Sequence, residues 1–211
     1  MQMGDMQMAL AARDARREDR RDTILDVAQA CFVAEGYGAT SMSTIAARLG
    51  GSKGTLYNYF RSKEELFDAF VRRSCERVLS QIDRFPEGDD LGKRLEQMAE
   101  AFLTHLLTPE AIAIHRLVVG EGERFPELAR LFYEAGPRPG LAHTAEMLKG
   151  LMERGELRKA DPSVAAHQFK DLALSGLYNL RLWGVIADPT PAERAAYAET
   201  AVDTFLRAYA P

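Results

Sequence analysis

The chain has 211 residues, enough for one large domain or two small ones, and its formal net charge is −4. Its 46% hydrophobic and 27% charged residues are typical of a globular protein and exclude an indiscriminate, strongly basic nucleic-acid binder. No apolar run approaches the roughly 20 residues of a membrane-spanning helix, and the first residues lack the apolar stretch of a secretory signal. We therefore expect a cytoplasmic protein that has no membrane partner and keeps its two cysteines reduced.

Charge is distributed unevenly along the chain. Residues 1–85 hold 13 Lys and Arg against 12 Asp and Glu, which is net +1. Residues 86–211 hold 14 against 19, which is net −5. This difference predicts a small N-terminal module that binds nucleic acid, attached to a larger body with another role.

The hydrophobic pattern repeats at the helical period throughout, and strand signals are almost absent. We therefore predict an all-α fold with nine to ten helices. Residues 1–15 are expected to form a mobile tail. The first helix then runs from about Arg16 to Glu35, and Gly36 ends it.

Two short helices are predicted next. Thr40 or Ser41 caps one of them, and Ser52 caps the other after a turn at Gly50-Gly51. Three apolar residues are expected to anchor the pair to the first helix: Ile45, Leu56 and Phe60. Residues 16–63 would then form a three-helix N-terminal domain that contains a helix-turn-helix.

A capping box at residues 62–65 predicts a connecting helix over residues 62–84. Cap and proline signals predict further helices at about 89–107, 109–122, 126–135, 140–154, 162–183 and 191–209. The prolines within residues 136–140 are expected to interrupt the backbone hydrogen bonds. Residues 64–211 would form one larger helical domain, with the connecting helix as the only element that joins it to the N-terminal domain.

The stretch from Ala39 to Lys63 has four basic residues and no acidic one. Its second helix is too short and too polar for a core helix, and it carries side chains that can bond bases or phosphates. The predicted DNA-contacting residues are Thr40, Ser41, Thr44, Ser52, Lys53, Gly54, Thr55, Tyr57, Asn58, Tyr59 and Lys63. The alternative from composition alone is an ordinary helical hairpin with a solvated polar face.

A basic run lies nearer the start of the chain, at Arg13, Arg16, Arg17, Arg20 and Arg21. Such a run can contact phosphates or the minor groove. Four acidic residues alternate with it, and we expect them to form i,i+4 ion pairs. A solvated helix end is therefore favoured over a DNA-binding arm.

The segment GYGATSMSTIAARLGGSKGTLYNYFRSKEELF resembles the DNA-binding segment of the TetR/AcrR family, and the likeness covers about residues 18–78. The resemblance implies a homodimeric, ligand-released transcriptional repressor on a palindromic DNA operator. Two positions depart from the family pattern: Gly51, where the usual Val would give a core contact, and Asn58, where His or Tyr is common. The segment HRLVVGEGERFPELARLFYEAGPRPG resembles, more loosely, AefR-type regulators of the same family.

The helices of the body carry a surplus of apolar residues, which indicates either deep core or a subunit interface. Because TetR-like proteins dimerise through their last two long helices, we expect an isologous interface there. Its predicted residues are Phe169, Ala173, Gly176, Leu177, Leu180, Trp183, Val202, Phe205, Leu206 and Tyr209.

Other apolar and aromatic residues are expected to surround a cavity for a small organic effector, with plain core as the alternative for each. They are Met98, Phe102, His105, His115, Phe132, Tyr133, Met147 and Tyr178. No catalytic, metal or cofactor motif is present, so an enzyme is not expected. Two other functions stay open: a constitutive helix-turn-helix protein without a ligand, and a small-molecule-binding protein with a vestigial DNA face.

Overall fold

The computed structural model describes the backbone of residues 2–82 and 90–211, and all regular structure in these ranges is helical. The eleven helices there are α1 (Gln2–Glu35), α2 (Met42–Arg48), α3 (Lys53–Tyr57), α4 (Lys63–Ile82), α5 (Leu91–Leu106), α6 (Pro109–Glu121), α7 (Pro126–Ala135), α8 (Pro137–Glu153), α9 (Pro162–Leu174), α10 (Leu177–Leu182) and α11 (Pro191–Tyr209). The all-α prediction is confirmed. In the described ranges no single helix is long and apolar enough to cross a membrane, and only α5 and α6, bent by 68°, reach that threshold as a pair.

Three boundaries differ from the sequence predictions. Helix α1 begins at Gln2 and leaves no tail before Arg16, because Gln, Met, Ala and Leu favour a helix there and no proline interrupts it. Gly136 alone separates α7 from α8, since Pro137 takes the first helical position, which needs no backbone donor. The helix predicted over residues 162–183 is broken at Gly176, whose φ of 80° lies in the left-handed region. The predicted stop of the connecting helix near Pro86 lies outside the described residues.

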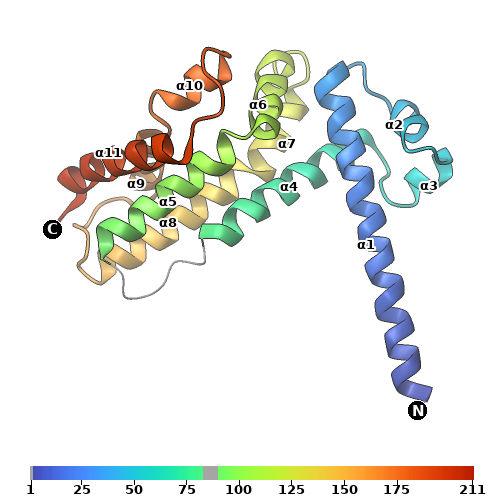
Figure 1. Ribbon diagram of the computed structural model, residues 1–211, viewed down its shortest axis with the longest axis horizontal. Coiled ribbons are helices and arrows are strands. Elements are labelled where there is room, and N and C mark those ends of the chain that lie inside the picture. Colours follow the sequence, from blue (N-terminus) through green and yellow to red (C-terminus); the bar gives the residue numbers. More distant parts are fainter. Residues whose placement is uncertain (1, 83–89) are drawn as a thin grey trace.

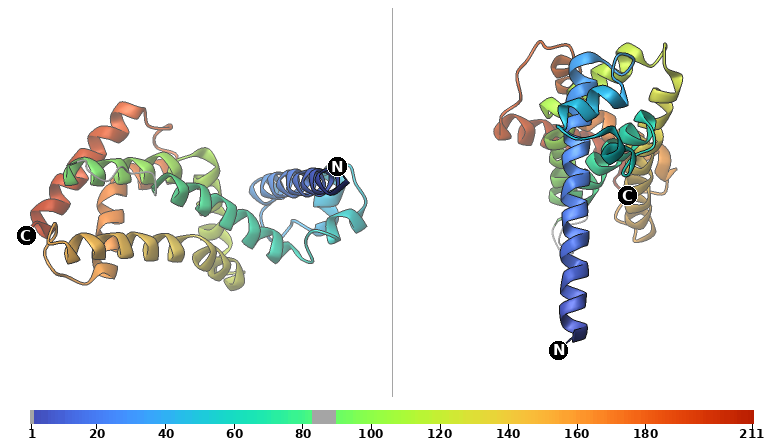
Figure 2. Two further views of the ribbon diagram at one scale, coloured as in Figure 1. Left: turned by 90° about the horizontal axis from the view of Figure 1, so that it is seen from below. Right: turned by 90° about the vertical axis from the view of Figure 1, so that its right-hand side faces the viewer.

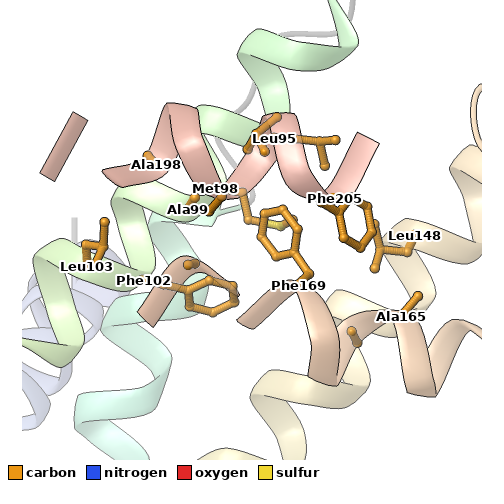
Figure 3. Packing of buried hydrophobic residues seen from close by; sticks show 14 of the residues in the cluster. Leu95, Met98, Ala99, Phe102, Leu103, Leu148, Ala165, Phe169, Ala198 and Phe205 are labelled. Atoms are coloured by element: carbon orange, nitrogen blue, oxygen red, sulfur yellow. The ribbon is translucent and has the colours of Figure 1, made fainter. Parts of the chain in front are cut away.

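The helices form two regions, with α1–α3 at one end and α9 and α11 at the other (Figure 1). Helix α4 runs between them, and α1 projects beyond the rest of the molecule toward its N-terminus (Figure 2). One core, formed by α5, α8, α9 and α11, includes Met98, Phe169 and Phe205 (Figure 3). A second core joins α1–α4 to buried residues of α6 and α7. The N-terminal core therefore extends beyond residue 63 and includes part of the predicted body.

The corner between α6 and α7 contacts the turn between α1 and α2 directly. The carboxylate of Glu121 accepts hydrogen bonds from the backbone N–H groups of Tyr37, at 2.7 Å, and Gly38, at 2.8 Å. The ring of Phe125 packs edge-on against Tyr37, with centroids 5.6 Å apart. We call these contacts the Glu121 joint. The prediction that the connecting helix alone joins the two parts is therefore wrong.

Lys63 and Thr40 reinforce this turn from within the N-terminal region. The Lys63 ammonium donates to the Tyr37 carbonyl at 2.9 Å and lies 4.3 Å from the centre of the Tyr37 ring. The buried Thr40 hydroxyl shares its one proton between the carbonyls of Gly36, at 2.7 Å, and Cys31, at 3.2 Å. A hydroxyl buried with two acceptors stabilises the turn because unpaired carbonyls would cost free energy there.

Substituting Gly36→Ala is expected to destabilise the protein more than Gly50→Ala. Both glycines have positive φ, 84° and 64°, where a Cβ costs about 1–2 kcal/mol. A Cβ at Gly36 also collides with Oε1 of Glu121, whereas one at Gly50 meets nothing within 4 Å. Displacing that carboxylate should cost a further 1–3 kcal/mol or so. Thermal unfolding of both variants measures the difference, and equal losses would contradict a structural role for the Glu121 joint.

Candidate nucleic-acid interface and cavity

Helices α2 and α3 form a helix-turn-helix whose two N-termini are capped in the same way. The hydroxyl of Ser41 accepts from the Thr44 N–H, and that of Ser52 from the Thr55 N–H, both at 3.1 Å. Gly50, with φ of 64°, makes the turn between the helices. The predicted anchors Ile45, Leu56 and Phe60 are buried. These anchors hold α2, α3 and the residues after α3 in the N-terminal core, and the exposed side chains of α3 point away from that core.

Most of the predicted DNA-contacting residues lie on this outward side. Ser41, Ser52, Lys53, Gly54, Tyr57 and Asn58 are exposed, and Thr44, Thr55 and Tyr59 are partly exposed. Each Ser–Thr hydroxyl pair, 3.0 Å apart, shares one proton and leaves the other for an outside acceptor. The arrangement suits phosphate contacts at the helix N-termini and base contacts from α3. These assignments stay predictions.

One of the predicted contacts is contradicted by the packing, and a second residue has a structural role. Thr40 is 2% exposed, and its hydroxyl is spent on the turn before α2, so it cannot reach a phosphate. Lys63 is held by the Tyr37 carbonyl and ring, so it serves the Glu121 joint. Gly51 is exposed, and a Cβ there would meet only the Arg20 guanidinium. The absent Val therefore loses no core contact, contrary to the sequence prediction.

The basic run on α1 is not neutralised as predicted. At a spacing of four residues its charges have the same sign, as in Arg13 with Arg17 or Asp14 with Glu18, so i,i+4 pairs cannot form. On a helical projection the five arginines fall within about 140° of one face and the acidic residues on the opposite face. None of the five forms an ion pair among the described side chains. We call this face the α1 basic stripe.

The two faces of α1 meet different neighbours. On the acidic face, Asp22 and Asp26 pair with Arg73 of α4 at 3.0 and 2.5 Å. On the basic face, Arg20 reaches the turn at Gly51, and Arg21 lies over the Phe60 ring at 5.3 Å. The α1 basic stripe therefore continues the outward side of the helix-turn-helix.

A cavity of about 910 Å³ lies in the body, between α4–α10 and the side of α1. Five of the predicted ligand residues line it: Phe102, His105, His115, Phe132 and Tyr178. Three do not, because packing directs them elsewhere. Met98 is fully buried in the α5–α11 core, Met147 packs against the same core, and Tyr133 is 49% exposed on the surface.

Sequence reasoning missed several residues of the cavity wall. Cys75, Leu141, Lys170, Leu174 and Asn179 belong to it, together with residues of the α7–α8 junction. No local pattern marks them, because they come from different helices and converge only in the folded chain. The Cys75 thiol donates to the Gly136 carbonyl at 3.3 Å, and burial raises its pKa, so it is a neutral wall group.

Most of the predicted interface residues are core residues of the single chain. Phe169, Ala173, Leu177, Val202, Phe205 and Tyr209 are buried in the core that α5, α8, α9 and α11 form. Figure 3 shows Phe169 and Phe205 in this core. These six residues cannot face a second subunit, so the prediction that they form the dimer interface is wrong. Gly176 and Trp183 are exposed, and Leu180 and Leu206 are partly exposed. The wide apolar arc reflects deep core, which was the other interpretation of the same pattern.

Comparisons with known proteins match both parts of the chain. Residues 24–70 match the family model of bacterial regulatory proteins of the tetR family. Residues 93–211, more than half of the chain, match the C-terminal domain of AefR-like transcriptional repressors.

Solved structures and curated proteins agree with these matches. A TetR-family regulator from Mesorhizobium loti is 30% identical, with a TM-score of 0.79 over 93% of this chain and 98% of that one. The flavonoid-responsive regulator FrrA is 33% identical, with a TM-score of 0.76 over 92% and 98%. The activator FasR from Mycolicibacterium smegmatis is 38% identical over 41% of this chain. The chain spans 40% of the length of FasR and 50% of a second curated regulator. The protein therefore belongs to the TetR family of helix-turn-helix transcriptional regulators, with an AefR-like C-terminal domain.

Proposed function

We propose that the protein is a repressor that binds a palindromic operator as a homodimer and releases it when a small organic effector fills the cavity. The observation that carries this proposal is that α6 belongs to both sites. Ile114 and His115 stand in the cavity wall, and Glu121 at the end of the same helix holds the turn before α2. The protein would act in the cytoplasm, without a cofactor and not as an enzyme.

The DNA face of each subunit would consist of α3, the N-terminus of α2 and the α1 basic stripe. Tyr57, Asn58 and Thr55 are proposed to contact bases, and Lys53 a phosphate. The two recognition helices of a dimer would lie about one DNA turn apart, roughly 34 Å. The arginines of the stripe would add phosphate contacts beside the groove that α3 enters.

The effector would act through a shift between two conformations. Filling the cavity displaces the wall residues of α6, and a rigid helix carries that displacement to Glu121, six residues or about 9 Å further along. The α1–α2 turn would then move relative to α4, which separates the recognition helices from their groove spacing. A constitutive DNA-binding protein would need no such cavity beside the Glu121 joint, so the structure favours the ligand-responsive alternative. A vestigial DNA face is disfavoured by the unpaired cations on α1 and α3.

The proposal of repression, as opposed to activation, is supported by the match to AefR-like repressors. FasR is named an activator, so relatives of this chain include both kinds. FrrA is named for a response to flavonoids, which supports a small organic effector here as well.

A second copy is proposed to pack on the outer side of the α9–α11 region. Four of the large hydrophobic residues that the described chain exposes lie there: Val164, Trp183, Val185 and Tyr197. The outward side of α11 also carries small residues, including Ala195, Ala196 and Thr200, which allow a close approach. This surface replaces the buried residues that the sequence predicted.

Removing the proposed phosphate contacts should weaken the salt dependence of DNA binding. Because a dimer carries two copies of each contact, Lys53→Ala is expected to lower the slope of log K against log salt by about two, and Arg13→Gln with Arg17→Gln by about four. The measurement uses fluorescence anisotropy with a duplex selected by the protein from a random pool. Lys93→Gln with Lys159→Gln changes the same charge on exposed residues of the body and should leave the slope unchanged. Unchanged slopes for both DNA-face variants would exclude these contacts.

Glu121→Gln should loosen the turn that it holds. An amide offers one acceptor and one donor where two N–H groups need acceptors, so one bond is lost and the charge assistance with it. Hydrogen exchange at the amides of Tyr37 and Gly38 is expected to rise at least about tenfold. Glu123→Gln is the control, since that side chain is exposed and makes no such bond. Exchange that is equal in the two variants would contradict the proposed relay.

Sedimentation at micromolar concentration is expected to give twice the mass of the chain. Tyr197→Glu should shift the equilibrium toward monomer, because it buries a charge in the proposed interface. Tyr133→Glu introduces the same charge at a comparably exposed tyrosine on α7 and should have no effect. A monomeric wild-type protein would overturn the dimer proposal.

A further inference from the structure

His115 is a polar side chain without a hydrogen-bond partner among the described residues of the cavity wall. It projects from α6 between two aromatic rings, with centroids 5.1 Å from Phe132 and 5.4 Å from Tyr178. Both rings stand nearly perpendicular to the imidazole, at 85° and 82°. Neither ring nitrogen has a hydrogen-bond partner among the described residues. Nδ1 is fully buried, so a molecule in the cavity can reach only Nε2. A polar side chain left unpaired in such a wall costs stability.

The imidazole is uncharged at neutral pH. Burial and, secondarily, the nearby Lys170 lower its pKa to about 4. A neutral imidazole has one nitrogen that donates and one that only accepts. The accepting nitrogen needs a proton donor, which an alkyl chain or a carboxylate does not bring.

Two further polar groups face the same space. Lys170 lies in the wall with its ammonium 2.9 Å from the carboxylate of its neighbour Asp171. The Tyr178 hydroxyl has no hydrogen-bond partner among the described residues, and burial raises its pKa, so it stays protonated. A ligand oxygen that donates to His115 can accept from either of these groups. Because Asp171 already neutralises Lys170, the site offers no unpaired cation to an anionic ligand.

We propose that His115, Lys170 and Tyr178 form a subsite that recognises the hydroxyl group of a planar aromatic effector. The hydroxyl donates to the imidazole and accepts from Lys170 or Tyr178. The ring system of the effector lies among Phe102, Phe132 and Ile114 in the wall. A hydroxyl is the group that can donate and accept at one atom, which matches the mixed character of the site.

The assignment rests on the proposed function for the ligand's role as an effector, but binding can be measured without DNA. Three probes separate the ligand classes: 4′-hydroxyflavone, 4′-methoxyflavone and dodecanoate. The two flavones differ only in that a methyl group replaces the hydroxyl proton. Titration calorimetry with the full-length chain should give an affinity for 4′-hydroxyflavone at least about tenfold above that for 4′-methoxyflavone, with dodecanoate weaker still.

Substitutions at His115 test the residue itself. His115→Phe keeps an aromatic ring between Phe132 and Tyr178 and should abolish the preference for the hydroxyl, with little change for 4′-methoxyflavone. His115→Gln keeps an acceptor and should retain part of the preference. His167→Phe removes an exposed histidine on α9 and is the control. Thermal unfolding of each variant establishes that it is folded before titration.

Several results would overturn the assignment: no binding of either flavone, equal affinities for the two, a preference that survives His115→Phe, or tightest binding of dodecanoate. DNA release by the same probes separates this inference from the proposed function. If 4′-hydroxyflavone binds through His115 but leaves DNA affinity unchanged, the subsite stands and the ligand response fails. If the binding of neither flavone depends on His115 but another molecule releases DNA, the ligand response stands and the subsite fails.

Discussion

The position of the helix-turn-helix depends on one carboxylate. Glu121 accepts two backbone hydrogen bonds from the turn before α2, and Lys63 holds the same turn from the other side. Bonds from backbone N–H groups to an ionised carboxylate are stronger than those between neutral groups. Together with α4, the Glu121 joint gives the N-terminal region two attachments to the body. Two attachments fix the orientation of the N-terminal region relative to the body, whereas a single connecting helix would leave that region free to pivot.

The Glu121 joint also explains why the cavity and the helix-turn-helix belong to one mechanism. Residues of α6 and α7 are buried in the N-terminal core, and other residues of the same helices form the cavity wall. Because helices move as rigid units, a wall residue cannot shift without affecting the far end of its helix. The division into a DNA-binding domain and a ligand domain is therefore less complete in the packing than in the sequence. A regulator built in this way needs no long pathway between its two sites.

The positive charge on the surface of the N-terminal region depends on which cations are already paired within the chain. Arg48 pairs with Glu35, Arg73 with two aspartates, and Lys63 with a carbonyl and a ring. Among the described residues of the N-terminal region, the cations that form no ion pair include Lys53 and the arginines of the α1 basic stripe. A net charge of −4 conceals this local excess, since the acidic surplus lies on the body. Local pairing is a better guide to a nucleic-acid face than the total charge.

The sequence alone determined the features that depend on neighbouring residues. The cap at Ser52, the stop at Gly36 and the burial of Leu56 and Phe60 all follow from contacts within a few residues or from helical periodicity, whereas the choice between Thr40 and Ser41 as a cap stayed open. Only the tertiary structure decided what the wide apolar arcs of α9 and α11 pack against. Phe169 and Phe205 lie in the core of a single subunit, not at a subunit interface, because α5 and α8 cover them. The tertiary structure also decided that Thr40 and Lys63 serve the fold and that Glu121 reaches a turn more than 80 residues away. The same residue types can serve a core, an interface or a binding site, and the choice depends on partners brought together from distant parts of the chain.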